Sequence, residues 1–373
     1  MIQRMKAYKV IISGGGTGGH IFPALAIANG IKEKKPEAEI LFVGAKGRME
    51  MEKVPQAGFN IVGLDVVGIQ RSFSIASIIK NLKFPFLLIK SLSKAKQIVE
   101  NFNPNIVIGV GGYASGPTLR MANKLNIPTL IQEQNSYAGL TNKWLSKKAS
   151  KICVAYSNMD KFFSKEKIIV TGNPVRKDII DLKTKKKEAL AHFKINNNEK
   201  VILVLGGSLG AKSINDGILN SLQLIKGKPI KLIWQVGKRY ISSISESLNK
   251  SEFSNVNAMA FINRMDLAYA AADIIVSRAG ALSISEITLV GKASILVPSP
   301  NVSEDHQTKN AMALVENKAA VLVEDGSTER LLEKALYLLN NEQEYASITK
   351  NAKLLGKPNA TEDIVKQVFK LTN

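Results

Sequence analysis

Residues 9–31 read KVIISGGGTGGHIFPALAIANGI, a short β-branched run that leads through a glycine loop into an amphipathic stretch. The order of strand, glycine turn and helix is typical of the first unit of a doubly wound α/β domain. Glycines let the backbone approach a ligand closely, and a helix N-terminus offers free N–H groups to an anion. The spacing of Gly14, Gly16 and Gly19 matches G-x-G-x-x-G, which by itself is a weak signal.

Strand-like and helix-like runs alternate along almost the whole chain. In the first half the buried-strand runs are EILFVGA, NIVIGV and PTLIQE, and in the second half they are VILVLGG, IKLIWQVG, NVNAMAF, ADIIVS and ASILVPS. Short apolar runs separated by helical stretches predict parallel sheets that are covered on both faces. We therefore expect an α/β protein with two Rossmann-like, doubly wound domains.

The character of the sequence changes near residues 170–200, where the turn TGNPVRKD precedes a lysine-rich helix and the polar run NNNEK. A chain of 373 residues is longer than one hydrophobic core usually serves. We expect an N-terminal domain at 1–172 and a C-terminal domain at 173–356. A last helix at about 357–373 is expected to pack back on the N-terminal domain.

The chain is strongly basic, with 51 lysines and arginines against 31 acidic residues and a formal net charge of +20. Such an excess favours a partner that carries phosphate: nucleic acid, anionic lipid or a charged substrate. A solvated lysine-rich surface is the alternative, and the run Lys183–Lys187 favours it for part of the charge. The sequence has neither an RNP-type aromatic strand nor a helix-turn-helix signature, so we expect no nucleic-acid partner.

A single cysteine, Cys153, excludes an internal disulfide and favours a reducing compartment. Its simplest interpretation is a buried structural thiol. The chain shows no secretory signal and no run of ~20 apolar residues that would cross a membrane. We expect a cytosolic protein, or one attached to a membrane from the cytosolic side.

Two further glycine loops follow strand-like runs: GVGGYASGP at 109–117 and GGSLGA at 206–211, in which Ser208 adds a hydroxyl donor. Open α/β sheets bind ligands at the carboxyl ends of their strands. Tight turns alone would explain one glycine loop but explain three poorly. A nicotinamide site is disfavoured because the second strand, LFVGAKG, lacks the acidic residue that binds the ribose.

The most informative constellation is SRAGALSISE at 277–286, directly after a strand-like run. Its small residues allow close backbone approach, and Ser283 and Ser285 could cap the helix or donate hydrogen bonds. Glu286 could accept two hydrogen bonds from a ribose diol. Alternatively it is a first-turn carboxylate that the helix dipole favours. Gln307, in DHQTKNA, could reach a sugar.

No pattern for a metal is apparent, because Asp-x-Asp is absent and the three histidines, His20, His192 and His306, lie far apart in the sequence. We expect no metal and no cofactor. The charge of a diphosphate would then be met by helix N-termini and by Arg176 or Arg278.

Several strings together resemble one family: GGGTGGHIFPALAIA, GVGGYASGP, QEQNSYAGLTNKWLS, TGNPVR, GGSLGAKSIN, SRAGALSISEI and DHQTKNA. They look like the signatures of the MurG family, the UDP-N-acetylglucosamine:N-acetylmuramyl-(pentapeptide) pyrophosphoryl-undecaprenol N-acetylglucosaminyltransferases. The resemblance runs in order from about Val10 to the final helix. It implies the GT-B architecture, in which two Rossmann-like domains face each other across a cleft.

The resemblance also implies an activity and partners. It implies an inverting, metal-independent transfer of GlcNAc from UDP-GlcNAc to the muramic acid 4-hydroxyl of undecaprenyl-linked lipid I, which forms lipid II in peptidoglycan synthesis. The N-terminal domain would bind the acceptor and the membrane, and the C-terminal domain would bind UDP-GlcNAc. The protein would be peripheral, on the anionic cytoplasmic face of the bacterial inner membrane.

Particular residues acquire roles through the resemblance. Near the donor sugar and the acceptor it places Thr17, Gly18, Gly19 and Asn135. Around UDP-GlcNAc it places Arg176, Ser208, Ile262, Ala281, Leu282, Ser283, Glu286 and Gln307. Ile262 would present backbone groups to the uracil, and Glu286 would bind the ribose. Two residues depart from the family pattern: Leu209 stands where glutamine is more frequent, and Ala279 where serine is common.

A direct displacement at the anomeric carbon needs a general base for the acceptor hydroxyl. His20 is the best candidate, although a histidine in this loop could instead hold only a backbone carbonyl or a sugar hydroxyl. Ser208 and the helix N-terminus behind it would stabilise the charge on the departing UDP. A UDP-sugar transferase of the same fold that acts on diacylglycerol is the alternative enzyme.

The segment Arg71–Lys96 is apolar and basic and has no acidic residue. Helical spacing gathers the side chains of Ile75, Ile78, Ile79 and Leu82, and Pro85 should kink or break the helix. One interpretation is a core helix with lysines on its wet face. The other is an interfacial anchor, whose lysines meet anionic lipid; Lys80, Lys83 and Lys90 would serve that role.

Overall fold

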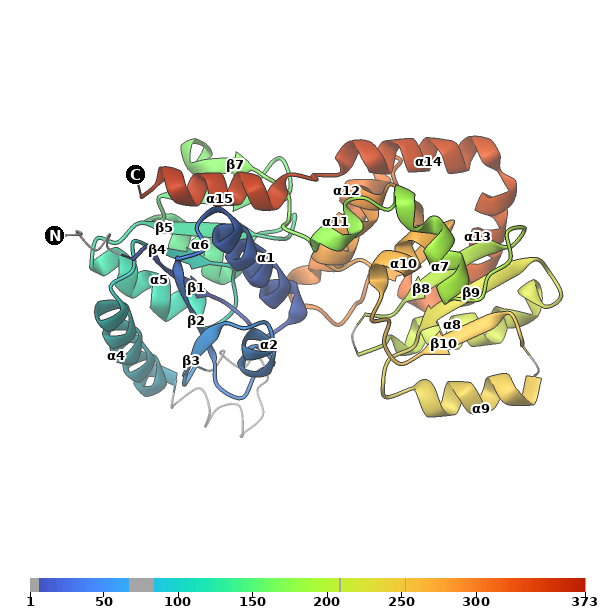
Figure 1. Cartoon of the computed structure of the whole chain (residues 1–373), viewed down its shortest axis with the longest axis horizontal. Coiled ribbons are helices and arrows are strands. Elements are labelled where there is room, and N and C mark those ends of the chain that lie inside the picture. Colours follow the sequence, from blue (N-terminus) through green and yellow to red (C-terminus); the bar gives the residue numbers. More distant parts are fainter. Residues whose placement is uncertain (1–6, 67–83, 208, 252, 373) are drawn as a thin grey trace. The chain divides into compact units, whose positions relative to one another are not determined.

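A seven-stranded parallel sheet forms the centre of the first unit in the computed structural model, which describes residues 7–66, 84–207, 209–251 and 253–372 (Figure 1). This unit ends at Val175 and takes in the C-terminal residues from Asn359 onward. The strand order is β3-β2-β1-β4-β5-β6-β7. Its strands are β1 (Lys9–Ser13), β2 (Glu39–Ala45), β3 (Asn60–Leu64), β4 (Ile106–Gly109), β5 (Thr129–Glu133), β6 (Lys151–Val154) and β7 (Ile168–Val170).

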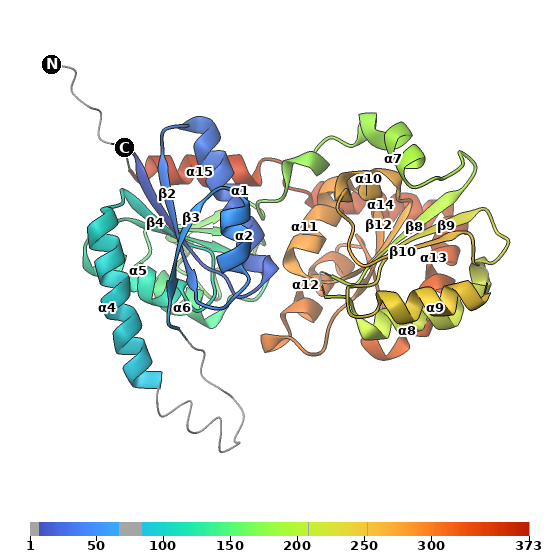
Figure 2. The same cartoon turned by 60° about the horizontal axis from the view of Figure 1, so that its bottom comes forward.

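Helices cover both faces of this sheet because the side chains of each strand alternate between two apolar cores. On β1, Val10 and Ile12 belong to one core and Ile11 to the other. Figures 1 and 2 show α1 and α15 side by side, and Gly30 of α1 makes room for Thr361 and Val365. The helices of this unit are α1 (Gly18–Lys34), α2 (Glu50–Gln56), α4 (Phe84–Phe102), α5 (Ser115–Lys124), α6 (Leu140–Ser146) and α15 (Ala360–Lys370).

The second unit, Arg176–Pro358, contains a six-stranded parallel sheet of order β10-β9-β8-β11-β12-β13. Its strands are β8 (Lys200–Leu205), β9 (Ile230–Gln235), β10 (Val256–Met259), β11 (Ile274–Arg278), β12 (Ala293–Val297) and β13 (Val321–Leu322). Its helices are α7 (Lys186–His192), α8 (Lys212–Ser221), α9 (Ile241–Ser251), α10 (Met265–Ala271), α11 (Ala281–Val290), α12 (His306–Val315), α13 (Leu331–Asn340) and α14 (Glu342–Leu355). The buried indole of Trp234 donates to Asn215 Oδ1 at 3.2 Å within its core.

In each sheet the strand order reverses at one point, because the first three strands are added toward one edge and the later strands toward the other. In the first unit it lies between β1 and β4, where Ser13 pairs with Gly109. In the second it lies between β8 and β11, where Leu205 pairs with Ser277. Ligands bind at such points, outside the carboxyl ends of the strands. Three of the predicted ligand loops follow β1, β4 and β8, and SRAGALSISE spans the end of β11.

The prediction of two Rossmann-like parallel-sheet domains, which make up the GT-B fold, is confirmed. Cys153 is buried, as its interpretation as a structural thiol predicts. Pro85 lies in the first turn of α4; the first half of the proposed anchor segment, residues 71–83 with Lys80 and Lys83, lies outside the described residues. No helix of the described ranges is long and apolar enough to cross a membrane.

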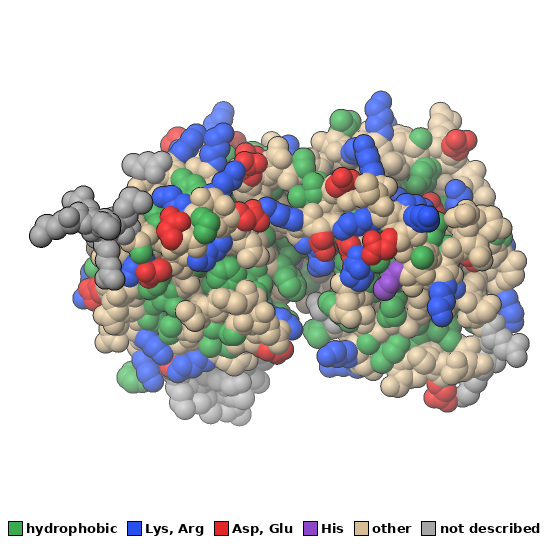
Figure 3. Space-filling view, viewed as in Figure 1, with side chains coloured by type: hydrophobic (Ala, Val, Ile, Leu, Met, Phe, Trp, Pro, Cys, Tyr) green, Lys and Arg blue, Asp and Glu red, His purple; other side chains and the backbone are tan. Residues whose placement is uncertain are grey.

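Charged side chains of both signs are spread over the face of the molecule that Figure 3 shows. In the view of Figure 3, lysine and arginine side chains are scattered over both units and alternate with acidic ones. This face has no single basic patch, in keeping with a solvated lysine-rich surface for much of the excess charge.

Candidate functional site

A buried carboxylate braces the first glycine loop of the N-terminal unit. Glu50, at the start of α2 and only 1% exposed, accepts hydrogen bonds from the N–H groups of Gly16 at 2.9 Å and Ala45 at 3.0 Å. A Cβ atom on Gly15, whose φ is +145°, would lie 2.2 Å from Glu50 Oε1. The loop therefore needs glycine here because the carboxylate occupies the space of a side chain.

The glycine loops after β1 and β4 are in direct backbone contact. Gly112 has a φ of +87°, and a Cβ on it would lie 2.4 Å from the Gly15 carbonyl oxygen. A Cβ on Gly111 would lie 2.9 Å from His20 Nε2. Turn geometry and close approach both require glycine at these positions, so the two loops form one surface at the reversal point of the sheet.

His20 lies in the first turn of α1, after Thr17, Gly18 and Gly19. Its Nδ1 is 3.0 Å from the carbonyl oxygen of Gly15 and 3.3 Å from Thr17 Oγ1. A carbonyl can only accept, so Nδ1 carries the proton in the bond to Gly15. The basic nitrogen of the neutral ring is then Nε2, the atom beside Gly111. Holding a backbone carbonyl is thus compatible with a base role for the other ring nitrogen.

Asn135 is held by a second buried carboxylate, that of Glu133 at the end of β5. Glu133 Oε1 accepts from the Asn135 backbone N–H at 3.0 Å and from its Nδ2 at 3.3 Å. The other oxygen, Oε2, accepts from Gly139 N–H at 3.0 Å and from Asn142 Nδ2 at 2.9 Å. Glu133 therefore fixes the loop that carries Asn135 and the start of α6.

Asn142 connects this loop to the glycine loops. Its Nδ2 lies 3.8 Å from the position of a Cβ on Gly111, the glycine that also faces His20. Its Oδ1 is buried and has no hydrogen-bond partner within the described part of the chain. A buried acceptor of this kind is suited to a hydroxyl or a water molecule.

In the second unit, a pocket of about 540 Å³ opens at the carboxyl ends of β8, β11 and β12. Gln307, a predicted donor contact, lines it, and the Gln307 side-chain oxygen accepts from Ser299 N–H at 2.9 Å. Ser208 lies outside the described residues. The residues that line the pocket are Gly206, Gly210, Ala211, Lys212, Ser213, Asp216, Tyr240, Arg278, Ser299, Asn301, Gln307 and Asp325.

Arg278 is built into the wall of this pocket. Its guanidinium pairs with Asp325 and donates to Ser213 Oγ at 2.8 Å and to the carbonyls of Val297 and Pro298, each at 3.2 Å. Much of its charge is thereby neutralised. Its main effect is to join the ends of β11 and β12 to the start of α8.

Glu286 lies in the second turn of α11 and is largely buried, so the alternative of a first-turn carboxylate is wrong. Its Oε1 accepts from Arg176 Nε at 3.0 Å and its Oε2 accepts from the Tyr269 hydroxyl at 2.9 Å. Burial raises the pKa of the Glu286 carboxyl, while the charge of Arg176 acts in the opposite direction. The structure thus unites the predicted residues Arg176 and Glu286 and adds Tyr269.

The other predicted donor contacts lie on neighbouring loops. Ala281, Leu282 and Ser283 form the first turn of α11, where backbone N–H groups lack intrahelical partners and suit an anion. Ile262 follows β10, and its N–H donates to Gln235 Oε1 at 3.0 Å. The Ile262 N–H is therefore already engaged inside the protein.

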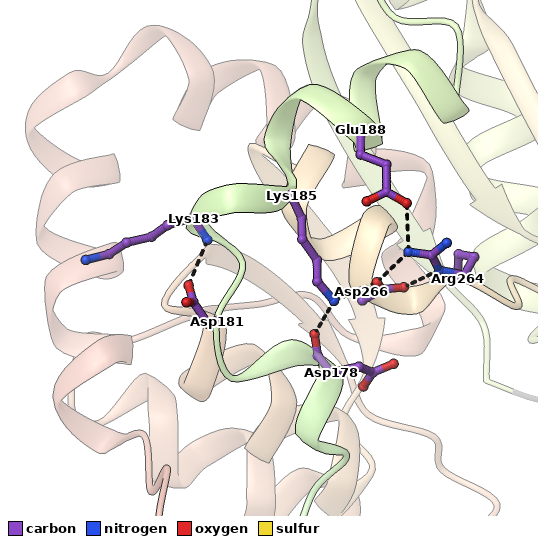
Figure 4. Close-up of polar contacts among 7 residues, drawn as sticks. All are labelled: Asp178, Asp181, Lys183, Lys185, Glu188, Arg264 and Asp266. Carbon is purple, nitrogen blue, oxygen red and sulfur yellow. Dashed lines mark hydrogen bonds and ion pairs between the residues drawn. The ribbon is translucent and has the colours of Figure 1, made fainter.

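A charged network follows Ile262 in the chain and is centred on Arg264 and Asp266 (Figure 4). The buried carboxylate of Asp266 accepts from Arg264 Nε and Nη2, both at 2.9 Å, and from Lys185 Nζ at 2.8 Å. Arg264 also pairs with Glu188 at 3.0 Å, and Lys185 donates to the Asp178 carbonyl at 2.8 Å. The network joins the start of α10 to residues 178–188. The hydrogen bonds from Arg264 hold the pKa of Asp266 well below its usual range.

Sequence reasoning found the loops but missed Glu50, Glu133, Asn142, Gln235 and Tyr269. Each acts through a contact to a backbone group or to a residue distant in the sequence, and no local pattern marks it. The described residues contain no group of three or more His, Cys, Asp or Glu side chains that could hold a metal ion.

Comparison with known proteins gives matches in both halves of the chain. Residues 10–154 match the glycosyltransferase family 28 N-terminal domain, and residues 201–368 match the family 28 C-terminal domain. Relatives from Flavobacterium psychrophilum and Cytophaga hutchinsonii are 51% and 54% identical, over 98% and 100% of this chain and 98% and 99% of theirs. Both are named UDP-N-acetylglucosamine--N-acetylmuramyl-(pentapeptide) pyrophosphoryl-undecaprenol N-acetylglucosamine transferase.

The chain is also similar to solved structures. MurG of Acinetobacter baumannii is similar with a TM-score of 0.78 and 30% identity, over 97% of this chain and 99% of that one. A UDP-GlcNAc 2-epimerase from Neisseria meningitidis has a TM-score of 0.65 at 19% identity, over 97% of this chain and 100% of that one, which shows likeness of fold alone.

Proposed function

Since this chain belongs to the MurG family within glycosyltransferase family 28, we infer that it transfers GlcNAc from UDP-GlcNAc to lipid I and so forms lipid II in peptidoglycan synthesis. The observation that carries this conclusion is identity above one half along the full length of relatives with that name. The enzyme is an inverting N-acetylglucosaminyltransferase.

The reaction is a direct displacement in which His20 serves as the base. The acceptor oxygen forms a bond to the anomeric carbon, the bond from that carbon to the UDP oxygen breaks, and the hydroxyl proton passes to Nε2 of His20. Support comes from the Gly15 carbonyl, which engages Nδ1–H and leaves Nε2 as the basic nitrogen. Thr17, Gly18 and Gly19 would place backbone groups beside the acceptor and the donor sugar, with Asn135 nearby.

UDP-GlcNAc binds to the second unit in this proposal. Glu286 accepts the ribose hydroxyls while it keeps its bonds to Arg176 and Tyr269, because a carboxylate offers about four lone-pair sites and two are engaged. Ile262 meets the uracil, and Gln307 meets the sugar. The first turn of α11, at Ala281–Ser283, and the loop with Ser208 receive the diphosphate, whose growing charge they stabilise as UDP leaves.

The protein works as a peripheral enzyme on the anionic cytoplasmic face of the inner membrane, where the undecaprenyl chain of its acceptor lies. Large apolar side chains are exposed on two helices of the first unit: Phe86 (71%) and Ile89 (67%) on α4, and Leu140 (60%) and Trp144 (52%) on α6. Lys90 and Lys143 belong to the same helices. Apolar side chains with flanking lysines suit the headgroup boundary of an anionic bilayer.

An assay of UDP release tests the acceptor. With lipid I the purified protein should release UDP from UDP-GlcNAc, and with diacylglycerol it should not; the opposite preference would contradict the proposal. Activity should also persist in excess EDTA, and a loss that magnesium restores would overturn metal independence.

A further inference from the structure

Gln235 is a buried side chain at the carboxyl edge of the second sheet. It is the last residue of β9, is 5% exposed, and pairs with Leu205 of β8 on one side and Met259 of β10 on the other. The loops that follow β8 and β10 are those assigned above to the diphosphate and the uracil. Gln235 therefore lies between two loops that would bind different parts of one ligand.

Both ends of the Gln235 amide are engaged. Its Oε1 accepts from Ile262 N–H at 3.0 Å, and its Nε2 donates to the Gly207 carbonyl at 2.9 Å. The N–H can only donate and the carbonyl can only accept, so the orientation of the amide is unambiguous. A carboxamide is the side chain that provides a donor and an acceptor on one rigid plane.

The backbone around this bridge is closely packed. A Cβ on Gly210 would lie 2.1 Å from the Val236 carbonyl oxygen, and a Cβ on Gly237 would lie 2.5 Å from the Leu209 carbonyl oxygen. The glycine loop after β8 thus rests on the residues that directly follow Gln235. The position of this glycine loop therefore depends on the end of β9. Because the Gln235 amide also binds the Ile262 N–H, the position of the Ile262 loop depends on the end of β9 as well.

We propose that Gln235 is a positioning residue that couples the diphosphate-binding loop to the uracil-binding loop. The proposal rests on the function proposed above. Gln235 sets the spacing of the two loops to match the span of a uridine diphosphate and does not touch the ligand. A ligand that contacts both loops should depend on the bridge more than one that lacks the β-phosphate.

The test is titration calorimetry of UDP and UMP with the full-length protein and its Gln235→Met variant, which keeps the size of the side chain but loses both hydrogen bonds. Two lost hydrogen bonds should weaken UDP binding about 10-fold or more, and UMP binding by a smaller factor. The KM for UDP-GlcNAc should rise in step, with the KM for lipid I unchanged. Gln235→Glu retains the acceptor for Ile262 but sets a carboxylate oxygen against the Gly207 carbonyl, so its UDP affinity should fall at least as far as that of Gln235→Met.

Asn255 offers a matched control, because its Nδ2 also bridges two backbone carbonyls, those of Ile225 and Ile230, each at 2.9 Å. Asn255→Leu should lower the melting temperature about as much as Gln235→Met and leave UDP affinity within twofold. Equal loss of UDP affinity in the Asn255 and Gln235 variants, or unchanged affinity in both Gln235 variants, would overturn the proposal. If the parent itself bound no UDP, the proposed function would fail, which is a separate outcome.

Discussion

The Nδ1 atom of His20 lies 3.0 Å from the carbonyl oxygen of Gly15, so one ring nitrogen of this histidine is engaged by the glycine loop that precedes it. The bond fixes the tautomer and the direction of the ring. Of the contacts described above, the bond between His20 and Gly15 bears most directly on the role of His20 as the base.

His20→Ala should lower kcat by ~10²–10⁴ and change donor affinity much less, since general-base catalysis contributes about that factor. His20→Asn is the matched variant, because its amide can still donate to the Gly15 carbonyl but has no basic nitrogen. Steady-state kinetics should show both variants equally impaired. Recovery of near-parental kcat in His20→Asn would reduce His20 to a structural role.

Glu286→Gln should weaken UDP binding about 10-fold or more, because hydrogen bonds to a charged group contribute ~1.5–3 kcal/mol. Since Glu286 is largely buried against Arg176 and Tyr269, the variant should also unfold more easily. Tyr269→Phe separates the two effects: it should lower the free energy of unfolding by about 1 kcal/mol and preserve UDP affinity. Unchanged UDP affinity in Glu286→Gln would exclude the ribose assignment.

Asp266→Asn should reduce the free energy of unfolding by about 2 kcal/mol at pH 7, because it weakens the charged hydrogen bonds to Arg264 and Lys185. The pKa of Asp266 is lowered from 3.8 in the folded state, mainly by Arg264, so its stabilising effect is present above pH 3.8. The effect is lost as the pH falls through the lowered folded-state value. Urea unfolding at pH 7 and pH 3 should therefore show a smaller difference between parent and variant at pH 3; a constant difference would contradict the charge argument.

The β-branched runs and glycine loops predicted the sheets and the ligand-binding edges because strand burial and positive φ angles leave local traces in a sequence. Contacts such as Arg176 with Glu286, 110 residues apart, leave none. Glu50 and Gln235 bind backbone groups. Every residue has such groups, so the sequence contains no particular residue type that would identify the partners of these two side chains. The first-turn alternative for Glu286 failed because α11 begins at Ala281, which sets the carboxylate one turn further along the helix.

Replacement of Lys80, Lys83 and Lys90 by glutamate should abolish co-sedimentation with anionic vesicles at low salt, since each lysine near such a surface contributes about 1 kcal/mol. Binding of the parent should weaken at high salt through screening. A control with the same charge change, Lys226, Lys228 and Lys231 to glutamate in the second unit, should sediment like the parent. Equal sedimentation of the first variant and the parent would move the membrane contact to another part of the surface.

Transfer of labelled GlcNAc from UDP-GlcNAc to lipid I by the purified protein tests the central claim most directly, with the anomeric configuration of the product determined by NMR. UDP-GlcNAc carries an α-linked sugar, so an inverting displacement predicts a β-linked GlcNAc on the muramic acid 4-hydroxyl. Label in a lipid II product with that linkage is the expected result. An α-linked product, or label that enters diacylglycerol and not lipid I, would contradict the assignment.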